Sequence, residues 1–306
     1  MSNKREFTAY LLLGAVVLLW GVNWPIMKIG LAYISPMWFA LARVFLGGAC
    51  IFAILAWQGR LHLPARRDLP IVITVGVLQI AVLLALLHTG VRYVDAGRSA
   101  VLSYTTPLWI GPLALVFLRE RLSGRKLAGL ALGLAGIAFL FDPTVFNFSD
   151  TTGLMGNAIL ILAAIVLAVV IVHVRAHPWP ISALELLPWQ MALGAMLLLP
   201  VTFMMEGPPK VVFSPALAAV LVYNGPVASA FCLWAYLTVM RNLPAMSTAM
   251  GSLGVPAVGI FFSVLLMGEP LPASKIAGLA LIAMGVLVVT LVDLGKPREP
   301  ALPEKQ

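Results

Sequence analysis

Aromatic, amide and basic side chains recur inside the long apolar runs of this sequence. Indole and phenol rings with sparse hydrogen bonders suit the binding of an amphiphilic or aromatic solute, including a cationic one. We expect the substrate-binding residues to be Trp20, Asn23, Trp24, Arg43, Gln79, His88, Tyr104, Trp109, Tyr223 and Trp234. The same amphipathic set includes Trp189, Gln190, Asn224 and Tyr236.

The tryptophans have a second interpretation, because aromatic residues also form belts at both surfaces of a membrane. Trp38 and Trp57 suit a belt, since both lie near the ends of apolar runs. Trp20 instead lies about 17 Å into its run, and Trp109 about 15–18 Å into its own, at the rise of an α-helix. These depths favour a cavity lining for Trp20 and Trp109.

Two ionisable side chains also fall inside apolar runs. Arg43 is the basic residue there, about 10 Å from the nearer end of its run, and an intramembrane charge is a functional hypothesis by default. Three roles are open for it: receiving a substrate carboxylate, snorkelling outward, or tying helix ends together. His88 is either a hydrogen bonder that faces the cavity, which we favour, or a core histidine.

Prolines at Pro25, Pro107, Pro226 and Pro256 are expected to kink their helices. Each proline removes a backbone hydrogen bond, which lipid tolerates only where protein or a cavity satisfies the freed carbonyl. Matching discontinuous helices are a sequence sign of a transport site. We therefore predict hinges at these positions, with static kinks as the alternative.

The composition places all of these residues in a membrane protein. Hydrophobic residues make up 61% of the chain, charged residues 10%, and the mean hydropathy is +1.00. Soluble domains carry about 25% charged residues. Apolar ranges of roughly 20 residues, long enough to cross the bilayer, lie near 9–28, 36–57, 70–92, 97–118, 125–141, 153–173, 184–204, 216–239, 246–267 and 273–293. The sequence predicts an all-α polytopic membrane protein with ten transmembrane helices.

An internal repeat divides these ten helices into two halves. Residues 103–137 match residues 252–286 at 11 of 35 positions, with a constant offset of 149. The pairs include Pro107 with Pro256 and Lys126 with Lys275. We expect one five-helix repeat in residues 1–146, a second in 147–294, and a short cytoplasmic tail in 295–306.

Basic residues in the loops predict opposite orientations for the two repeats. With the N-terminus in the cytoplasm, the inner segments hold 14 of the 20 Lys and Arg residues and the outer segments hold 5. This asymmetry follows the positive-inside rule and places both termini in the cytoplasm. Because each half has an odd number of helices, the repeats are expected to be inverted, which is a transporter architecture.

Several partners and chemistries are not expected. The net charge of +8 lies in short loops, so topology explains it and no nucleic-acid partner is predicted. Cys50 and Cys232 lie in apolar runs and are expected to pack rather than to bind metal. The sequence has no HExxH, GxSxG or paired-carboxylate motif at a membrane face, which argues against an enzyme. A scaffold role is not expected either, because packing alone would not require paired proline kinks with polar aromatic residues between them. We expect no cofactor and no signal-peptide cleavage.

Glycines on two helices and the placement of the acids complete the pattern. Gly129, Gly133 and Gly136, with Gly278 and Gly285, allow close helix approach. Packing within the bundle is favoured over a dimer face, and a monomer or weak homodimer is expected.

No acidic residue falls in the central third of an apolar range. A proton- or sodium-coupled transporter usually has a buried carboxylate, so we predict facilitated transport.

The sequence resembles a known transporter family. The run LWGVNWPIMK at residues 19–28, the block Pro107…Glu120…Lys126-Leu-Ala-Gly129 and its second copy are similar to the ten-helix EamA-type exporters of the drug/metabolite transporter superfamily. The resemblance spans nearly the whole chain. It implies two inverted five-helix repeats around a central cavity, built mostly from the first, third, fourth, sixth, eighth and ninth helices.

Within that family the aromatic residues are most similar to those of bacterial aromatic amino-acid exporters. That resemblance implies cavity roles for Trp20, His88, Tyr104 and Trp109. The expected function is export of amino acids and other small neutral amphiphilic metabolites across the bacterial cytoplasmic (inner) membrane by alternating access. Efflux of drugs or cationic compounds is the main alternative.

Overall fold

The computed structural model describes residues 2–90, 93, 102–119, 123–140, 151–178, 181–268 and 273–294, and this part of the chain is almost wholly helical. Each of the ten predicted ranges contains helix. The helical segments are α1 (Ser2–Gly30), α2 (Pro36–Trp57), η1 (Arg66–Asp68), α3 (Leu69–Ile73), η2 (Thr74–Val82), α4 (Leu83–Gly90), α6 (Thr106–Leu113), η3 (Ala114–Leu118), α7 (Gly124–Leu140), α8 (Thr151–Ala176), α9 (Ala183–Glu206), α10 (Pro215–Val222), η5 (Tyr223–Phe231), α11 (Cys232–Asn242), α12 (Ala245–Ser252), α13 (Gly254–Met267) and α14 (Ala273–Leu294).

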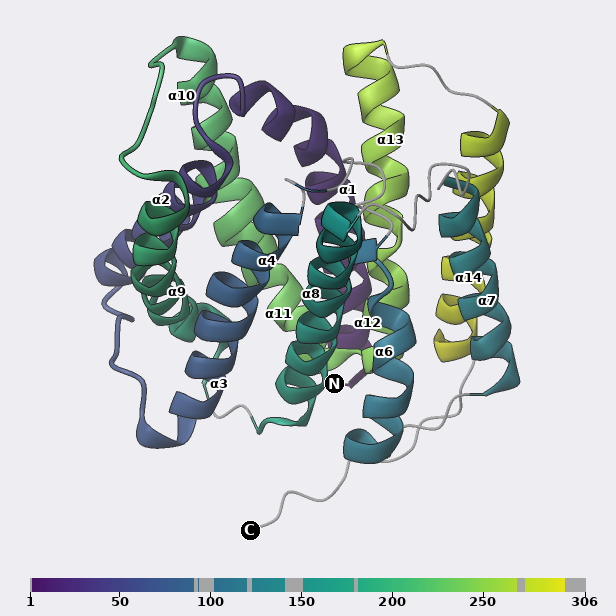
Figure 1. The fold of residues 1–306 in the computed structure, drawn as a ribbon. Helices are drawn as coiled ribbons and strands as arrows, with labels where there is room; N and C mark the ends of the chain where they lie inside the picture. Colours follow the sequence, from purple (N-terminus) through teal and green to yellow (C-terminus); the bar gives the residue numbers. More distant parts are fainter. Residues whose placement is uncertain are drawn as a thin grey trace.

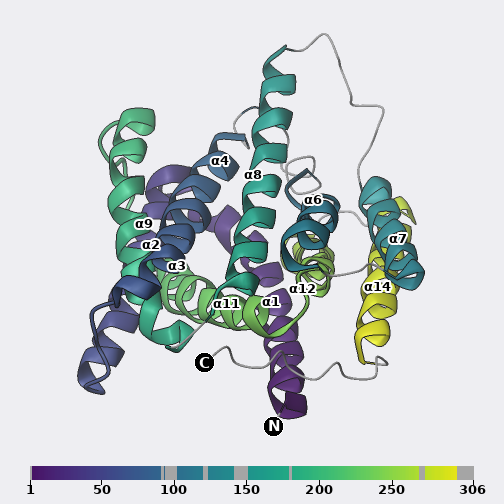
Figure 2. The same cartoon turned by 90° about the horizontal axis from the view of Figure 1, so that it is seen from below.

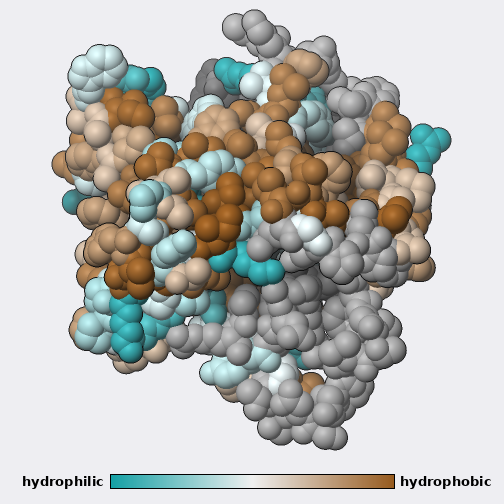
Figure 3. Space-filling view, turned by 90° about the horizontal axis from the view of Figure 1, so that it is seen from above, coloured by the Kyte–Doolittle hydropathy of each residue, from teal (hydrophilic) through white to brown (hydrophobic). Residues whose placement is uncertain are grey.

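The surface of this bundle is apolar over a broad area (Figure 3). Phe45 is 65% exposed, Phe117 67% and Met204 86%, although such side chains are normally buried in a soluble protein. Seven helical segments are long and apolar enough to cross a membrane, and shorter apolar helices cover 106–118 and 276–289. An all-helical polytopic membrane protein is therefore the observed fold class.

The helices form a central group flanked by two antiparallel pairs (Figures 1 and 2). The pair α2 and α9 packs at one edge, and the pair α7 and α14 packs at the other. Between them lie α1, α8, α11 and α6 with α12 and α13. The start of α1 packs against Leu243, and Arg175 at the end of α8 donates to the Arg241 carbonyl. Because both contacts lie at the end of α11, α1 and α8 run in opposite directions.

Contacts between the two halves occur in equivalent pairs: where a helix of the first half packs on one of the second, their equivalents at the offset of 149 also pack together. α1 packs on α11 and α13, and α8, its equivalent at the offset of 149, packs on α4 and α6. Likewise α2 packs on η5 while α9 packs on η2. The exchange extends to side chains: Tyr223 donates to the Leu19 carbonyl at 2.9 Å, and its equivalent Thr74 lies 2.6 Å from Nδ1 of His173 in α8. The two halves thus make the same contacts with each other.

Wide π-helical turns occur at equivalent places in the two halves. η2 covers Thr74–Val82 and η5 covers Tyr223–Phe231, which are the same nine positions at the offset of 149. Each turn crosses a neighbouring helix at glycine. A Cβ on Gly225 would lie 2.7 Å from Cβ of Leu46, and one on Gly76 would lie 2.9 Å from the Gln190 carbonyl oxygen. Turns of this kind are frequently found at functional sites.

The predicted glycine stripe packs α7 against α14 inside the chain. A Cβ on Gly136 would lie 2.7 Å from the Gly278 carbonyl oxygen, and one on Gly285 would lie 2.6 Å from the Gly129 carbonyl oxygen. Backbone atoms at that distance cannot move aside for a new methyl group as the end of a flexible side chain can. The stripe therefore serves packing within the bundle, as favoured from the sequence.

We expect Gly285→Ala to destabilise the protein by about 1–3 kcal/mol, because the new methyl group overpacks the α7–α14 crossing. Gly14→Ala is the matched control: a Cβ there meets nothing within 4 Å, so the better helix propensity of alanine should stabilise α1 by about 1 kcal/mol or less. Thermal unfolding in one detergent measures both variants. A Gly285→Ala protein as stable as the parent would contradict the close packing of α7 against α14.

α2 and α9 are joined at both of their ends. At one end, both carboxylate oxygens of Glu206 accept from the Met37 backbone N–H at 3.2 Å, and the Trp38 indole donates to the Gly207 carbonyl at 3.0 Å. At the other end, Arg60 pairs with Glu185 at 2.7 Å, and the Trp189 indole donates to the His62 carbonyl at 2.9 Å. Glu206 thus caps a helix whose own Ser35 makes no side-chain cap.

Glu206→Ala is expected to cost about 1–3 kcal/mol of unfolding free energy, because it leaves partly buried N–H groups of α2 without an acceptor. Glu206→Gln keeps an acceptor oxygen and should cost less. Arg60→Ala removes a pair whose arginine side chain is 49% exposed, so it should cost no more than about 1 kcal/mol. Thermal unfolding of the three variants tests this order. A larger loss of stability in Arg60→Ala than in Glu206→Ala would contradict it.

Candidate substrate-binding site

The backbone carbonyl of Ala228 lies at the centre of the predicted site. Within η5 the Cys232 N–H bonds the Ser229 and Val227 carbonyls, whereas in an α-helix it would bond that of Ala228. Two side chains from other helices donate to the Ala228 oxygen instead, the Trp20 indole at 2.8 Å and Nη2 of Arg43 at 3.4 Å. A wide turn has exposed a backbone acceptor in mid-span, and side chains satisfy it.

Arg43 crosses from α2 to two other helices. Its Nε donates to the Ser229 hydroxyl at 2.8 Å, and its Nη1 lies 3.4 Å from the sulfur of Met27 in α1. Of the three roles that the sequence left open, snorkelling outward is wrong, because the guanidinium is directed at η5. Arg43 does tie helices together, although in mid-span and not at helix ends.

Aromatic residues form one wall of the same region. The rings of Trp20 and Tyr236 pack with centroids 5.1 Å apart at 60°. Trp24 hydrogen-bonds the Tyr104 side chain, and Tyr104 in turn lies within electrostatic range of Tyr236. Tyr223 extends this wall by its bond to α1. The structure therefore brings residues from α1, the segment before α6, η5 and α11 together.

Buried amides supply unsatisfied polar atoms within the bundle. The carboxamide oxygens of Asn23, Gln79 and Asn224 are buried and have no hydrogen-bond donor among the described residues. The same holds for both polar atoms of the Gln190 side chain. Buried polar groups in proteins are normally hydrogen-bonded, so these atoms mark places where a ligand or water would bind.

Four members of the predicted set have hydrogen-bond or ring partners outside this group of residues. His88 donates from Nδ1 to the Leu84 carbonyl of its own helix at 2.9 Å, and the Trp109 indole makes a 3.4 Å contact with the Thr105 hydroxyl. Trp234 pairs with Phe231, at 5.6 Å between ring centroids. The interpretation of Trp189 as a mid-depth residue is wrong, because it bonds the loop after α2 at the Arg60 end.

The predicted kinks occupy different kinds of backbone. α6 begins at Thr106 after a turn at residues 104–105, and α13 begins at Gly254 after a turn at Leu253. Pro107 and Pro256 therefore lie in the first turn of a new helix. Pro226 lies within η5, whereas Pro25 is enclosed in an uninterrupted α1.

The sequence profile of the EamA-like transporter family matches the chain twice, over residues 7–142 and 154–291. The two matches cover most of the chain and coincide with its two halves. The chain belongs to the EamA-like transporter family.

Relatives of this EamA-like transporter extend over the full bundle. An uncharacterized transporter of Bacillus subtilis, YoaV, is 28% identical over 90% of this chain and 94% of its own. A probable terminal-alkyne amino-acid exporter of Streptantibioticus cattleyicolor is 29% identical over 95% of this chain and 96% of its own. A solved crystal structure with 22% identity covers 94% of this chain and 99% of its own at a TM-score of 0.74, which establishes the shared fold.

Family membership and the apolar helices together define the class of protein. It is a transporter, and a multi-pass protein of the bacterial cytoplasmic (inner) membrane. A small-molecule substrate and a lipid environment follow from that class.

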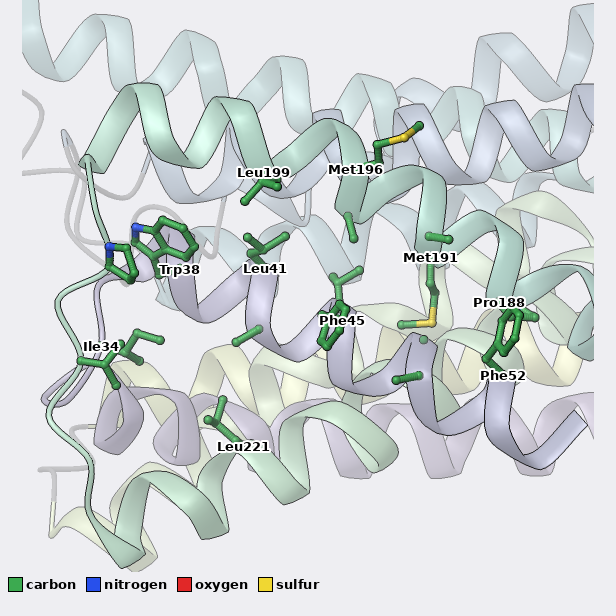
Figure 4. Close-up of a pocket in the computed structure, with 18 of the residues that line it drawn as sticks. Ile34, Trp38, Leu41, Phe45, Phe52, Pro188, Met191, Met196, Leu199 and Leu221 are labelled. Atoms are coloured by element: carbon green, nitrogen blue, oxygen red, sulfur yellow. The ribbon is translucent and has the colours of Figure 1, made fainter. Parts of the chain in front are cut away.

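An apolar groove of about 880 Å³ lies apart from the polar site of this EamA-like transporter (Figure 4). Its walls come from α2, α9, α10 and the segment before α10, with Leu41, Phe45, Met191 and Leu199 along its length. None of the predicted substrate-binding residues lines it. Since Phe45 is 65% exposed, the groove opens on the face that lipid covers.

Sequence reasoning missed the acceptors that organise the site. Ala228 and Ser229 receive Trp20 and Arg43, but an alanine carbonyl has no sequence signature. Pro226, two residues before Ala228, was the available signal for disturbed hydrogen bonding there. Glu206 has no sequence signal for its role either, because its partner Met37 lies 169 residues away in the sequence.

Proposed function

We propose that this EamA-like transporter exports small amphiphilic metabolites, chiefly aromatic and other neutral amino acids, through a site at the Trp20–Arg43–Ala228 contact. The observation that supports this most directly is the combination of an aromatic wall with a mid-span guanidinium and unpaired amide oxygens. Such a site offers a rigid apolar surface and a few placed polar groups. The proposed lining comprises Trp20, Asn23, Trp24, Arg43, Gln79, His88, Tyr104, Trp109, Tyr223 and Trp234.

We further propose that all ten helical ranges cross the membrane as two inverted repeats, residues 1–146 and 147–294, with both termini and the tail 295–306 in the cytoplasm. The exchanged contacts of α1 with α13 and of α8 with α6 support the repeats. The antiparallel pairs support the inversion. On this topology the Glu206 end faces outward and the Arg60 end faces the cytoplasm. Pro107, Pro256, Pro226 and Pro25 are the proposed hinge or kink positions for alternating access around the site.

Transport is proposed to be facilitative. The acids nearest to the bundle interior lie at helix ends: Asp68 at the start of α3, Glu185 in the first turn of α9 and Glu206 at its end. Coupled transporters usually carry the coupling ion on a carboxylate at membrane depth. The substrate gradient would then set the direction of net flux.

The test is uptake by purified protein in liposomes of labelled tryptophan, phenylalanine and methionine, compared with a cationic dye, with and without an imposed pH gradient. Saturable amino-acid uptake that equilibrates, and does not accumulate when the gradient is applied, is the expected result. Empty liposomes give the background for each solute.

Two outcomes would overturn the proposal. Dye uptake without amino-acid uptake would favour the efflux of cationic compounds. Uphill accumulation of amino acid driven by the pH gradient would contradict facilitated transport while leaving the substrate class intact.

A further inference from the structure

Arg43 carries a charge in mid-span that has no acidic partner among the described residues. Its partners are a hydroxyl, a thioether and a backbone carbonyl, all of them uncharged. The groups that interact with it electrostatically are Cys232, Tyr223 and His88, and none of them is negatively charged as a thiol, phenol or imidazole. An ionised side chain at membrane depth is costly unless an opposite charge or water compensates it. The site therefore favours a bound anion.

The guanidinium keeps hydrogen-bond donors for that anion. Arginine has five N–H donors, and a carboxylate engages two of them side by side. In Arg43 the Nε hydrogen and one hydrogen on each terminal nitrogen are directed at Ser229, Met27 and Ala228. One N–H on each terminal nitrogen remains as a donor for a carboxylate oxygen.

Asn23 lies on the face of α1 that carries Met27, a contact of this guanidinium. Trp20, Asn23 and Met27 occupy one face of α1, because residues three and seven apart in a helix are neighbours along a stripe. Trp20 shares the Ala228 carbonyl with Arg43, and Met27 contacts Arg43 directly. Asn23, between them on the stripe, is 3% exposed and its carboxamide oxygen has no donor in the described part of the chain. The helix face that contacts the guanidinium thus also carries an unpaired acceptor.

We propose that Arg43 and Asn23 together bind a zwitterionic headgroup, with the substrate carboxylate on the Arg43 guanidinium and the substrate ammonium on the Asn23 carboxamide oxygen. This inference rests on the proposed function and names the chemical class within it. Trp20, packed on Tyr236, would carry the apolar part of the solute. Arg43 is then the residue that sets specificity, since its charge repels an organic cation that lacks a carboxylate.

The experiment compares three solutes that share an indole ring: tryptophan, tryptamine, which lacks the carboxylate, and indole-3-propionate, which lacks the ammonium. The parent protein in liposomes should transport tryptophan best and tryptamine at least about tenfold less well. Arg43→Gln should lower tryptophan transport by about tenfold or more, because it removes charge-assisted hydrogen bonds. It should leave tryptamine transport unchanged or higher.

Two further variants separate recognition from helix packing. Ser229→Ala removes a helix contact of Arg43 but keeps its charge, so the ratio of tryptophan to tryptamine transport should stay at the parent value. Asn23→Leu should reduce tryptophan transport while sparing indole-3-propionate. Circular dichroism and thermal unfolding establish that each variant is folded before its transport is compared.

The outcomes distinguish this inference from the proposed function. If Arg43→Gln and Ser229→Ala lower tryptophan and tryptamine transport by the same factor, Arg43 only holds helices together and the inference is overturned. Parent protein that prefers tryptamine to tryptophan would also overturn it. If the parent transports none of the three indoles or the other amino acids, the proposed function itself is wrong.

Discussion

Replacing Trp20 with alanine is expected to raise the KM for tryptophan about tenfold to a hundredfold. The indole forms the wall against which we place the apolar part of the solute, and burying an aromatic side chain contributes about 1.5–3 kcal/mol. Trp20 also holds η5 by its 2.8 Å bond to the Ala228 carbonyl and packs on Tyr236. Its loss should therefore lower the thermal stability of the protein as well as its affinity.

Trp20→Phe separates these two effects. Phenylalanine keeps a ring for stacking but cannot donate to the Ala228 carbonyl, so this variant should lose about 1 kcal/mol of stability with a smaller rise in KM. Trp57→Ala is the matched control, because Trp57 is 88% exposed at the end of α2. Saturation kinetics in liposomes measure KM. A Trp20→Ala protein with lowered stability and an unchanged KM would show that Trp20 packs the bundle and does not contact substrate.

The sequence predicted the positions of the helices because lipid imposes a length and an apolar composition on each span. It also predicted which residues depart from that composition, and Trp20, Trp24, Tyr104, Arg43 and Tyr223 do lie around one part of the bundle. The internal repeat could be predicted from the amino-acid sequence alone, because similar sequences at a constant offset adopt similar folds. What these residues bind stays a prediction.

The remaining features depend on contacts that no local pattern encodes. The π-helical turns η2 and η5 arise where glycine crossings and a side-chain donor from another helix replace backbone bonds. The cap on α2 comes from Glu206, and only packing of α9 against α2 brings it there. Trp189 was misplaced because its indole bonds the His62 carbonyl in the loop after α2. That partner lies 127 residues away in the sequence, and only tertiary packing brings the two together.

The interruptions at Pro107 and Pro256 lead to the second large expected effect. The carbonyl of Ser103, which Pro107 cannot bond, accepts from the Thr106 hydroxyl at 3.1 Å. Bonds of the tighter i to i−3 type, Leu108 to Thr105 and Leu253 to Met250, span the two turns. Both breaks are therefore held by weak local bonds, as a hinge requires.

We expect the double variant Pro107→Ala/Pro256→Ala to fold normally, with equal or higher thermal stability, and to transport tryptophan about tenfold more slowly. Each alanine restores one N–H to its helix, and a backbone hydrogen bond contributes about 1 kcal/mol. Two such bonds, formed only in the straightened helices, favour one conformation by more than about tenfold. Pro36→Ala is the control, because no helix directly precedes Pro36, so an N–H at this position has no helical carbonyl to bond. Initial rates at saturating tryptophan decide the matter: a double variant as fast as the parent means that both kinks are static, and the conformational change must then pass through η2 and η5.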